Sequence, residues 1–102
     1  MINWGHCSKD DVGPGWKFLL DLLEWHLDQV PEQIDVIQVK EKFGGLRFYV
    51  NYETELLEII NIIESISQYV CEQCGNPGKL DTSRYWMKTL CSDCSNIRNT
   101  RP

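Results

Sequence analysis

Apolar residues recur at three- and four-residue spacing from residue 14 to residue 30, which predicts an amphipathic helix. Proline suits the first helical position, occupied here by Pro14, and Pro31 would stop the helix. One apolar face of this helix consists of Trp16, Leu19, Leu20, Leu23, Leu27 and Val30. We expect this face to pack into the core. His26 lies beside it, at the edge of the core.

A second apolar stripe, formed by Phe18, Leu22 and Trp25, lies on nearly the opposite side of the same helix. A surface helix of a monomer normally shows one apolar face. Two arrangements would bury the second stripe: the helix is sandwiched between two layers of its own domain, or the stripe forms an interface. We favour a homodimer contact, because a symmetric pair is the commonest way to cover such a patch.

Residues 34–42 and 46–52 carry β-branched and aromatic residues in partial or clean alternation, which predicts a β-hairpin. Gly44-Gly45 between them would supply the positive φ angles of a tight turn. Alternation sorts the side chains onto two faces. The inward face comprises Ile37, Val39, Leu46, Phe48 and Val50; the outward face comprises Gln38, Lys40, Arg47, Tyr49 and Asn51, with Lys42 near the turn.

Residues 53–70 predict a second helix with an acidic start, which suits the positive end of the helix dipole. Its apolar face would consist of Leu56, Ile59, Ile60, Ile63, Ile66 and Val70. The density of isoleucine lowers helix propensity, so a strand over residues 57–63 is the alternative. The length and the spacing favour the helix. Residues 1–13 predict irregular structure, with Trp4 held against the body.

Two C-x2-C pairs, Cys71/Cys74 and Cys91/Cys94, are separated by sixteen residues. Short loops of this spacing turn both sulfurs inward, and a spacer of about fifteen to twenty residues is typical of a four-cysteine zinc site. A disulfide framework is less well supported, because no secretory signal precedes it. A thioredoxin-like redox motif needs one pair in a βαβ pattern that is not visible here.

The segment around these cysteines predicts a turn at Asn76-Pro77-Gly78, a small hairpin from Lys79 to Leu90 and a short last helix after Cys94. This is the order of a treble-clef site, and a plain zinc ribbon is the close alternative. The sequence therefore predicts an α+β fold in one domain, 1–102, with an α+β body, 1–70, and a zinc-binding lobe, 71–98.

The composition of the chain argues against several classes of protein. The formal net charge is -5, a poor match for a general nucleic-acid binder, which needs surplus Lys and Arg on one face. The sequence contains no run of eighteen apolar residues, so it predicts no membrane-spanning helix. The first residues lack the basic start and apolar core of a signal peptide. We therefore expect a cytoplasmic protein.

Four motifs stand out along the chain: Gly15-Trp16 before a Leu-rich helix, the long run Val39-Lys40-Glu41-Lys42-Phe43-Gly44-Gly45-Leu46-Arg47-Phe48-Tyr49, Cys71-x2-Cys74-Gly75-x-Pro77-Gly78 and Trp86-x2-Thr89-Leu90-Cys91-x2-Cys94. Together they resemble a family of small uncharacterised proteins of bacteria, phages and prophages. The resemblance covers about residues 13 to 94. It implies a phage or mobile-element setting, including interference with a host system, and brings no settled activity.

No catalytic arrangement is visible in the sequence. Four cysteines would close the zinc shell and leave no position for water. The two histidines, His6 and His26, belong to no Ser, His and Asp set, and Cys7 beside His6 is best explained as a spare reduced cysteine. We therefore expect a non-enzymatic binding protein for a small anionic ligand such as a nucleotide. A protein-interaction module or inhibitor of a host protein is the alternative.

The outward hairpin face is the predicted ligand site. Its members are Gln38, Lys40, Lys42, Gly44, Gly45, Arg47, Tyr49 and Asn51. Arg47 offers a planar fork for an anion, Tyr49 could stack on a base, and Gly44-Gly45 would let backbone N–H groups approach a phosphate. A solvated sheet face explains the same residues without a ligand. A nucleic-acid site on the lobe, at Arg84, Tyr85, Trp86 and Lys88, is less favoured than a cover for the zinc core.

Overall fold

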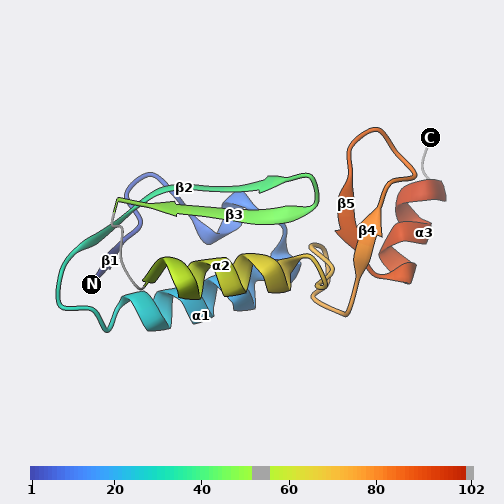
Figure 1. Ribbon diagram of the computed structural model, residues 1–102. Coiled ribbons are helices and arrows are strands. Elements are labelled where there is room, and N and C mark those ends of the chain that lie inside the picture. Colours follow the sequence, from blue (N-terminus) through green and yellow to red (C-terminus); the bar gives the residue numbers. More distant parts are fainter. Residues whose placement is uncertain (52–55, 101–102) are drawn as a thin grey trace.

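The computed structural model describes residues 1–51 and 56–100 of an elongated molecule that measures 48 × 23 × 18 Å. Two parts follow one another along its long axis (Figure 1): the body, residues 1–70, and the lobe, residues 71–100. The elements are β1 (Ile2–Asn3), η1 (Lys9–Asp11), η2 (Pro14–Trp16), α1 (Lys17–Leu27), β2 (Ile34–Lys42), β3 (Gly45–Val50), α2 (Leu56–Ser67), β4 (Lys79–Asp81), β5 (Lys88–Leu90) and α3 (Ser92–Thr100). The predicted α+β order of helix, hairpin, helix and cysteine lobe is confirmed.

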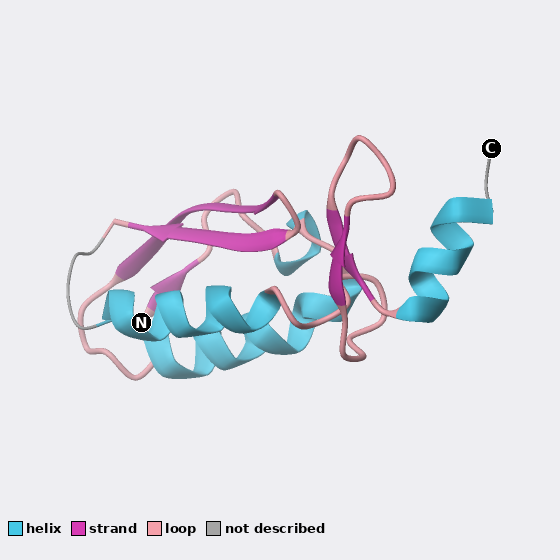
Figure 2. Cartoon of the chain, turned by 45° about the vertical axis from the view of Figure 1, so that its right-hand side comes forward, coloured by secondary structure: helices cyan, strands magenta, loops and turns pink. Residues whose placement is uncertain are grey.

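The body has two layers. The sheet has the order β1-β2-β3, with β1 parallel and β3 antiparallel to β2. Helices α1 and α2 run side by side in opposite directions across one face of this sheet (Figure 2). The first apolar face of α1 is buried between the layers as predicted, and Trp16, Leu20, Leu23 and Leu27 are fully enclosed.

Helix α1 departs from the prediction in two ways. It ends at Leu27 rather than near Val30, and the chain then turns over residues 28–30 before Pro31. The second stripe is not covered: Phe18 and Leu22 are each 46% exposed and Trp25 is 62% exposed. The sandwiched helix is therefore wrong, because α1 and α2 share one layer and the described part of the chain supplies no layer beyond it.

Strand β2 contains a β-bulge. Val36 lies opposite Val50, but Gln38, not Ile37, lies opposite Tyr49, so Ile37 is the extra residue. An extra residue shifts the alternation by one. Val36 is therefore buried where Ile37 was predicted, and Ile37 is 62% exposed. After the bulge the predicted faces are confirmed by the pairs Val39–Phe48 and Lys40–Arg47.

The hairpin turn is centred one residue earlier than predicted. Lys42 pairs with Gly45, so Phe43 and Gly44 form the two-residue turn, with φ of 53° and 79°. Tight hairpin turns with two positive φ angles are favoured by the twist of the strands. Glycine adopts this conformation freely, whereas a bulky residue does so at a cost of roughly 1–2 kcal/mol. Phe43 nonetheless occupies it and is 65% exposed.

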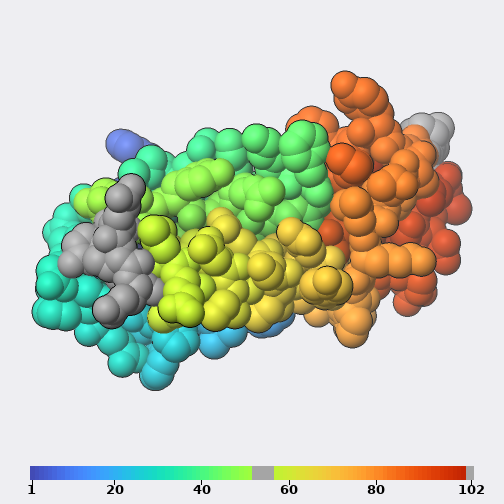
Figure 3. Space-filling model, in the orientation of Figure 1, coloured from blue at the N-terminus to red at the C-terminus, as the bar shows by residue number. Residues whose placement is uncertain are grey.

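Helix α2 covers the outer edge of β3, as the space-filling view shows (Figure 3). The Leu46 N–H donates to Ser67 Oγ at 2.9 Å, and the Phe48 N–H donates to Glu64 Oε2 at 2.8 Å. Burial raises the pKa of the Glu64 carboxyl. These side chains satisfy donors that an edge strand would otherwise leave open.

The predicted second helix is confirmed over residues 56–67, and the strand over residues 57–63 is wrong. Its predicted start at residues 53–55 lies outside the described residues. Ile66 was assigned to the buried face, yet it is exposed, because Ser67 is turned toward the edge strand in its place. Ile60 and Ile63 are buried as expected.

The first thirteen residues are more regular than expected. Strand β1 pairs with the start of β2, from Ile2 to Ile34. Trp4 is held against the body as predicted: its ring meets Phe48 edge-on at 5.8 Å, and its indole N–H donates to Glu24 at 2.8 Å. This segment therefore covers the side of the core that α2 leaves open.

The lobe is attached to the body where η2 meets the first cysteine loop. The Gly15 N–H donates to the Glu72 carbonyl at 2.9 Å, and the Trp16 indole N–H donates to the Val70 carbonyl at 2.9 Å. A Cβ on Gly15 would lie 2.1 Å from the Cys71 carbonyl oxygen and 2.6 Å from the Gly75 nitrogen. Only glycine fits between these backbones.

We predict that Gly15→Ala destabilises the protein by about 1–3 kcal/mol, the cost of forcing extra atoms into a packed site. Chemical denaturation at constant metal concentration measures this. Gly45→Ala is the matched control, because a Cβ there would meet nothing closer than the Lys42 carbonyl oxygen at 3.6 Å. Equal stability of the two variants would show that the lobe does not depend on this contact.

Candidate functional site

The structure brings the four predicted cysteines together. The sulfur atoms of Cys71, Cys74, Cys91 and Cys94 all lie within 4.8 Å of one another, and those of Cys74 and Cys91 are 3.5 Å apart. Four sulfurs placed at about 2.3 Å around one ion would be roughly 3.8 Å apart. The cluster therefore fits a single four-coordinate metal ion.

The local backbone structure brings the four sulfur atoms together. The first loop closes by a hydrogen bond from the Gly75 N–H to the Cys71 carbonyl at 2.9 Å, and Gly75 has a φ of 84°. The antiparallel pair β4–β5 follows and leads into Cys91. Cys94 lies in the first turn of α3, where its N–H points to Cys91 Sγ at 3.4 Å. Loop, hairpin and helix thus follow in the order of a treble clef.

The thiols have unequal surroundings. Burial opposes ionisation of the Cys71 thiol, but backbone N–H groups of Cys91, Cys74 and Gln73 outweigh it and lower its pKa to about 7. The interaction with Cys91 raises the pKa of the Cys94 thiol. Proximity of this kind stabilises one thiolate at the expense of its neighbours, and a divalent cation would favour the ionised form of all four.

The lobe has almost no core of its own. Its buried apolar cluster is Cys71, Leu90 and Cys91, with Cys94 at its edge. Leu80, Tyr85 and Trp86 are exposed, so the prediction that aromatic side chains cover the cysteine centre is wrong. So few contacts cannot offset the ordering of a segment of this length, at about 1–2 kcal/mol per residue.

Two buried or partly buried carboxylates that the sequence did not single out hold the lobe together. Asp81 accepts from the Ser83 hydroxyl and N–H, which lower the pKa of its carboxyl to about 2, and from the Ser95 hydroxyl of α3 at 2.7 Å. Glu72 is 4% exposed, accepts from the Thr89 N–H at 3.2 Å, and its pKa is raised by burial. The sequence feature that could have identified them is their position: both are acidic residues between the first and the last cysteine of the cluster.

The hairpin tip is docked onto the lobe. The Thr89 hydroxyl donates to the Gly44 carbonyl at 2.6 Å. Glu41 accepts from the Gly44 N–H at 2.9 Å and from the Trp86 indole N–H at 2.8 Å. Gly44 is buried in this contact, and its N–H already has an acceptor. The predicted approach of a phosphate to the Gly44-Gly45 backbone is therefore wrong.

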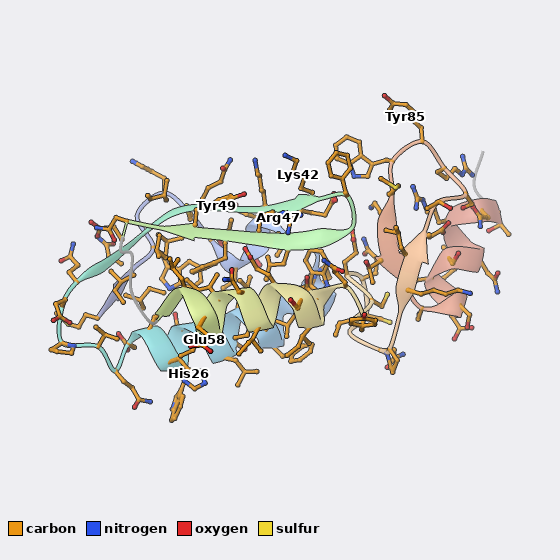
Figure 4. The ribbon with its side chains drawn as sticks, in the orientation of Figure 1. His26, Lys42, Arg47, Tyr49, Glu58 and Tyr85 are labelled. Atoms are coloured by element: carbon orange, nitrogen blue, oxygen red, sulfur yellow. The ribbon has the colours of Figure 1, made fainter. Side chains whose placement is uncertain are left out.

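The outward face of the sheet keeps most of its predicted residues. Figure 4 shows Lys42 and Tyr49 on the side of the body away from the helices. The Lys40 ammonium lies 5.9 Å from the Tyr49 ring centroid. Among the residues that the structure describes, neither Lys40 nor Lys42 has a carboxylate within 4.0 Å.

The other three residues of the predicted ligand set, Arg47, Asn51 and Gln38, have different surroundings from the two lysines. Arg47 is half-buried, and its charge acts on Glu64, where it opposes part of the rise in pKa that burial causes. The Asn51 side chain accepts from the Asp35 N–H at 2.8 Å and closes the open end of the hairpin. Gln38 lies opposite Tyr49 and remains exposed on the outward face.

An apolar pocket that the sequence did not predict lies beside this face. It has a volume of about 440 Å³ and is lined by Glu41, Lys42, Phe43, Tyr85, Trp86 and Met87. Tyr85 is fully exposed at the tip of the loop between β4 and β5, on the same side of the molecule as Lys42 (Figure 4). The one sequence signal was an aromatic residue directly before Gly-Gly in the turn.

Comparisons with protein families, with curated proteins and with solved structures found no match to this chain. The resemblance to phage and bacterial proteins stays a prediction, and the arguments below rest on the chain's own geometry. No helix in the described ranges is long and apolar enough to cross a bilayer.

We predict that Cys91→Ser loses the bound metal and unfolds the lobe, because Cys91 is buried at the centre of the cluster. Elemental analysis should give about one metal ion per chain for the wild type and far less for the variant. Cys7→Ser is the matched control, since the Cys7 sulfur contacts the Val36 carbonyl in the body, remote from the cluster. A metal-free wild type with an intact lobe by circular dichroism would contradict the metal centre.

Proposed function

We propose that this protein is a non-enzymatic binding protein, stabilised by a structural zinc ion, whose ligand is a small anion of the nucleotide type. The observation that carries the proposal is the 440 Å³ pocket lined by exposed aromatic side chains and by Lys42, which, like Lys40, has no carboxylate within 4.0 Å among the described residues. Pockets of this size lie within the usual range for small-molecule sites. Lys42 belongs to both features and links them.

Zinc suits the cysteine centre better than other common ions. Soft thiolate ligands in a tetrahedral arrangement favour zinc over the hard cations magnesium and calcium. The binding free energy of such an ion, roughly 10–16 kcal/mol, supplies what the small lobe core lacks. Four thiolates complete the coordination shell, which supports a structural role for the ion.

The aromatic pocket fits the base of a nucleotide. Phe43, Tyr85 and Trp86 line the pocket from two separate loops, and Trp86 is fixed by its hydrogen bond to Glu41. Stacking of a base on an aromatic side chain contributes about 1–3 kcal/mol. Phe43 also keeps an unfavourable positive φ while largely exposed, and such outliers cluster at ligand sites.

The phosphate would lie on the outward face of the sheet. Lys40 and Lys42 project from β2 on this face, and Arg47 lies opposite Lys40 on β3. In a chain of net charge -5, Lys40 and Lys42, with no carboxylate within 4.0 Å among the described residues, create a local positive site. Hydrogen bonds from cations to phosphate oxygens are short and strong. Base and phosphate would thus be bound by adjacent parts of one surface.

We predict that Lys42→Ala weakens binding of ADP by about 10- to 150-fold, which corresponds to the 1.5–3 kcal/mol of a hydrogen bond to a charged group. Isothermal titration of purified protein with ADP, ATP and adenosine measures this. Arg47→Ala should weaken binding less, because Glu64 already takes part of its charge. The control is Lys17→Ala, which removes an exposed charge from α1.

Failure of every nucleotide to bind the wild type would overturn the nucleotide proposal. Equal affinities of Lys42→Ala and Lys17→Ala would move the site elsewhere, to the lobe around Arg84 and Lys88. Tighter binding of a single-stranded oligonucleotide than of ADP would replace the small ligand by a nucleic acid.

We also predict that Phe43→Gly separates stability from binding. Removing the side chain relieves the cost of the positive φ, so the free energy of unfolding should stay equal or rise by up to about 1 kcal/mol. Loss of one stacking ring should reduce nucleotide affinity by about 5-fold or more. Thermal unfolding and the same titration give the two values, and a variant that binds as well as wild type would remove Phe43 from the site.

A further inference from the structure

A group of exposed apolar side chains lies on the opposite side of the body from the proposed nucleotide site. We call it the helix face; it consists of Phe18, Leu22 and Trp25 of α1, Ile62 and Ile66 of α2, and Tyr69 just after α2. Figure 4 places His26 and Glu58 on this side, away from Lys42 and Tyr49. Exposed apolar patches of several side chains mark interaction sites in soluble proteins.

The arrangement of α1 and α2 would allow a third helix to pack against the helix face. Helices α1 and α2 run side by side in opposite directions (Figure 2), and each carries one row of the exposed apolar residues of the helix face. The row on α1 runs over eight residues, Phe18 to Trp25, which is about 10 Å at 1.5 Å per step, and the row from Ile62 to Tyr69 covers the same number of residues. A helix of three to four turns laid along the seam between α1 and α2 would contact both rows.

The charged residues around the helix face indicate which kind of partner would bind there. A pocket of about 390 Å³ beside Trp25 is lined by Asp21, Glu24, Trp25, Asp28 and Gln29. Among the described residues, Lys9 pairs with two of these three carboxylates, Asp21 at 2.7 Å and Glu24 at 3.0 Å, and Asp28 accepts from the Ile2 N–H at 3.2 Å. Across the seam α2 carries the exposed Glu58 and no Lys or Arg, whereas its other carboxylate, Glu64, is turned to the edge of β3. The surroundings of the helix face are therefore acidic.

This acidity argues against a second copy of the same face. Two identical faces would bring Asp21, Asp28 and Glu58 of both copies toward one another, and like charges at an interface cost several kcal/mol. A partner with lysine or arginine beside its apolar residues has the opposite pattern. Its cation could enter the pocket and lie on the Trp25 ring, an arrangement that favours ammonium and guanidinium groups.

We propose that the helix face binds a basic amphipathic helix of a protein partner, with apolar side chains on the α1–α2 seam and a basic side chain in the pocket beside Trp25. This surface shares no residue with the nucleotide site, so it stands independently of the proposed function.

The test uses the zinc-loaded full chain and a fluorescein-labelled synthetic peptide of about 14 residues, or four turns, with leucine at helical spacing and lysine elsewhere. Fluorescence anisotropy should show binding that weakens with added salt. Trp25→Ala should reduce the affinity at least about tenfold, as expected for a central aromatic residue. Ile37→Ala, which removes an equally exposed apolar side chain from the other side of the sheet, should change nothing.

A peptide with the same leucines and glutamate in place of lysine checks the charge argument. Equal binding of the two peptides, no binding of the lysine peptide, or equal effects of Trp25→Ala and Ile37→Ala would each overturn the proposal. Sedimentation equilibrium of the protein alone tests the other occupant. A dimer that Trp25→Ala converts to a monomer would show that a second copy covers the helix face.

Discussion

The contact between Gly15 and the first cysteine loop is the constraint on which the arrangement of the molecule depends. Backbone meets backbone there, with the Gly15 N–H on the Glu72 carbonyl and no space for a Cβ. The same short segment continues as α1, whose Trp16 is buried and bonded to the Val70 carbonyl. A metal ion that curls the cysteine loop thereby also fixes the start of the helix layer.

A second attachment gives the lobe its role in the proposed site. Thr89 bonds to the Gly44 carbonyl, and Trp86 bonds to Glu41, so the hairpin tip and the loop after β4 are held at a fixed distance. The aromatic pocket exists only between these two segments. If the cysteine cluster holds a metal ion, its loss would therefore disrupt the pocket without changing a residue that lines it, and the proposed binding would depend on the metal.

Local patterns predicted the elements, because helical and strand periodicity reflect one buried face and the cysteine spacing reflects one short loop. The predictions were wrong where contacts between residues far apart in the sequence determine the structure. The bulge at Ile37 depends on how β2 pairs with β3, and the burial of Gly44 depends on the lobe that docks against it. Ser67 displaced Ile66 from the interior because a strand edge needed an acceptor. None of these partners is near in sequence.

The net charge of -5 conceals two surfaces of opposite character. Lys40, Lys42 and Arg47 lie on or beside the open face of the sheet, and Asp21, Asp28 and Glu58 lie around the helix face. One sheet and one helix layer separate them, filled by a continuous core that includes Leu20, Leu23 and Phe48. Because the surfaces share no side chain, occupation of one leaves the other accessible. The two proposed ligands, a small anion and a basic helix, would therefore not compete for the same side chains.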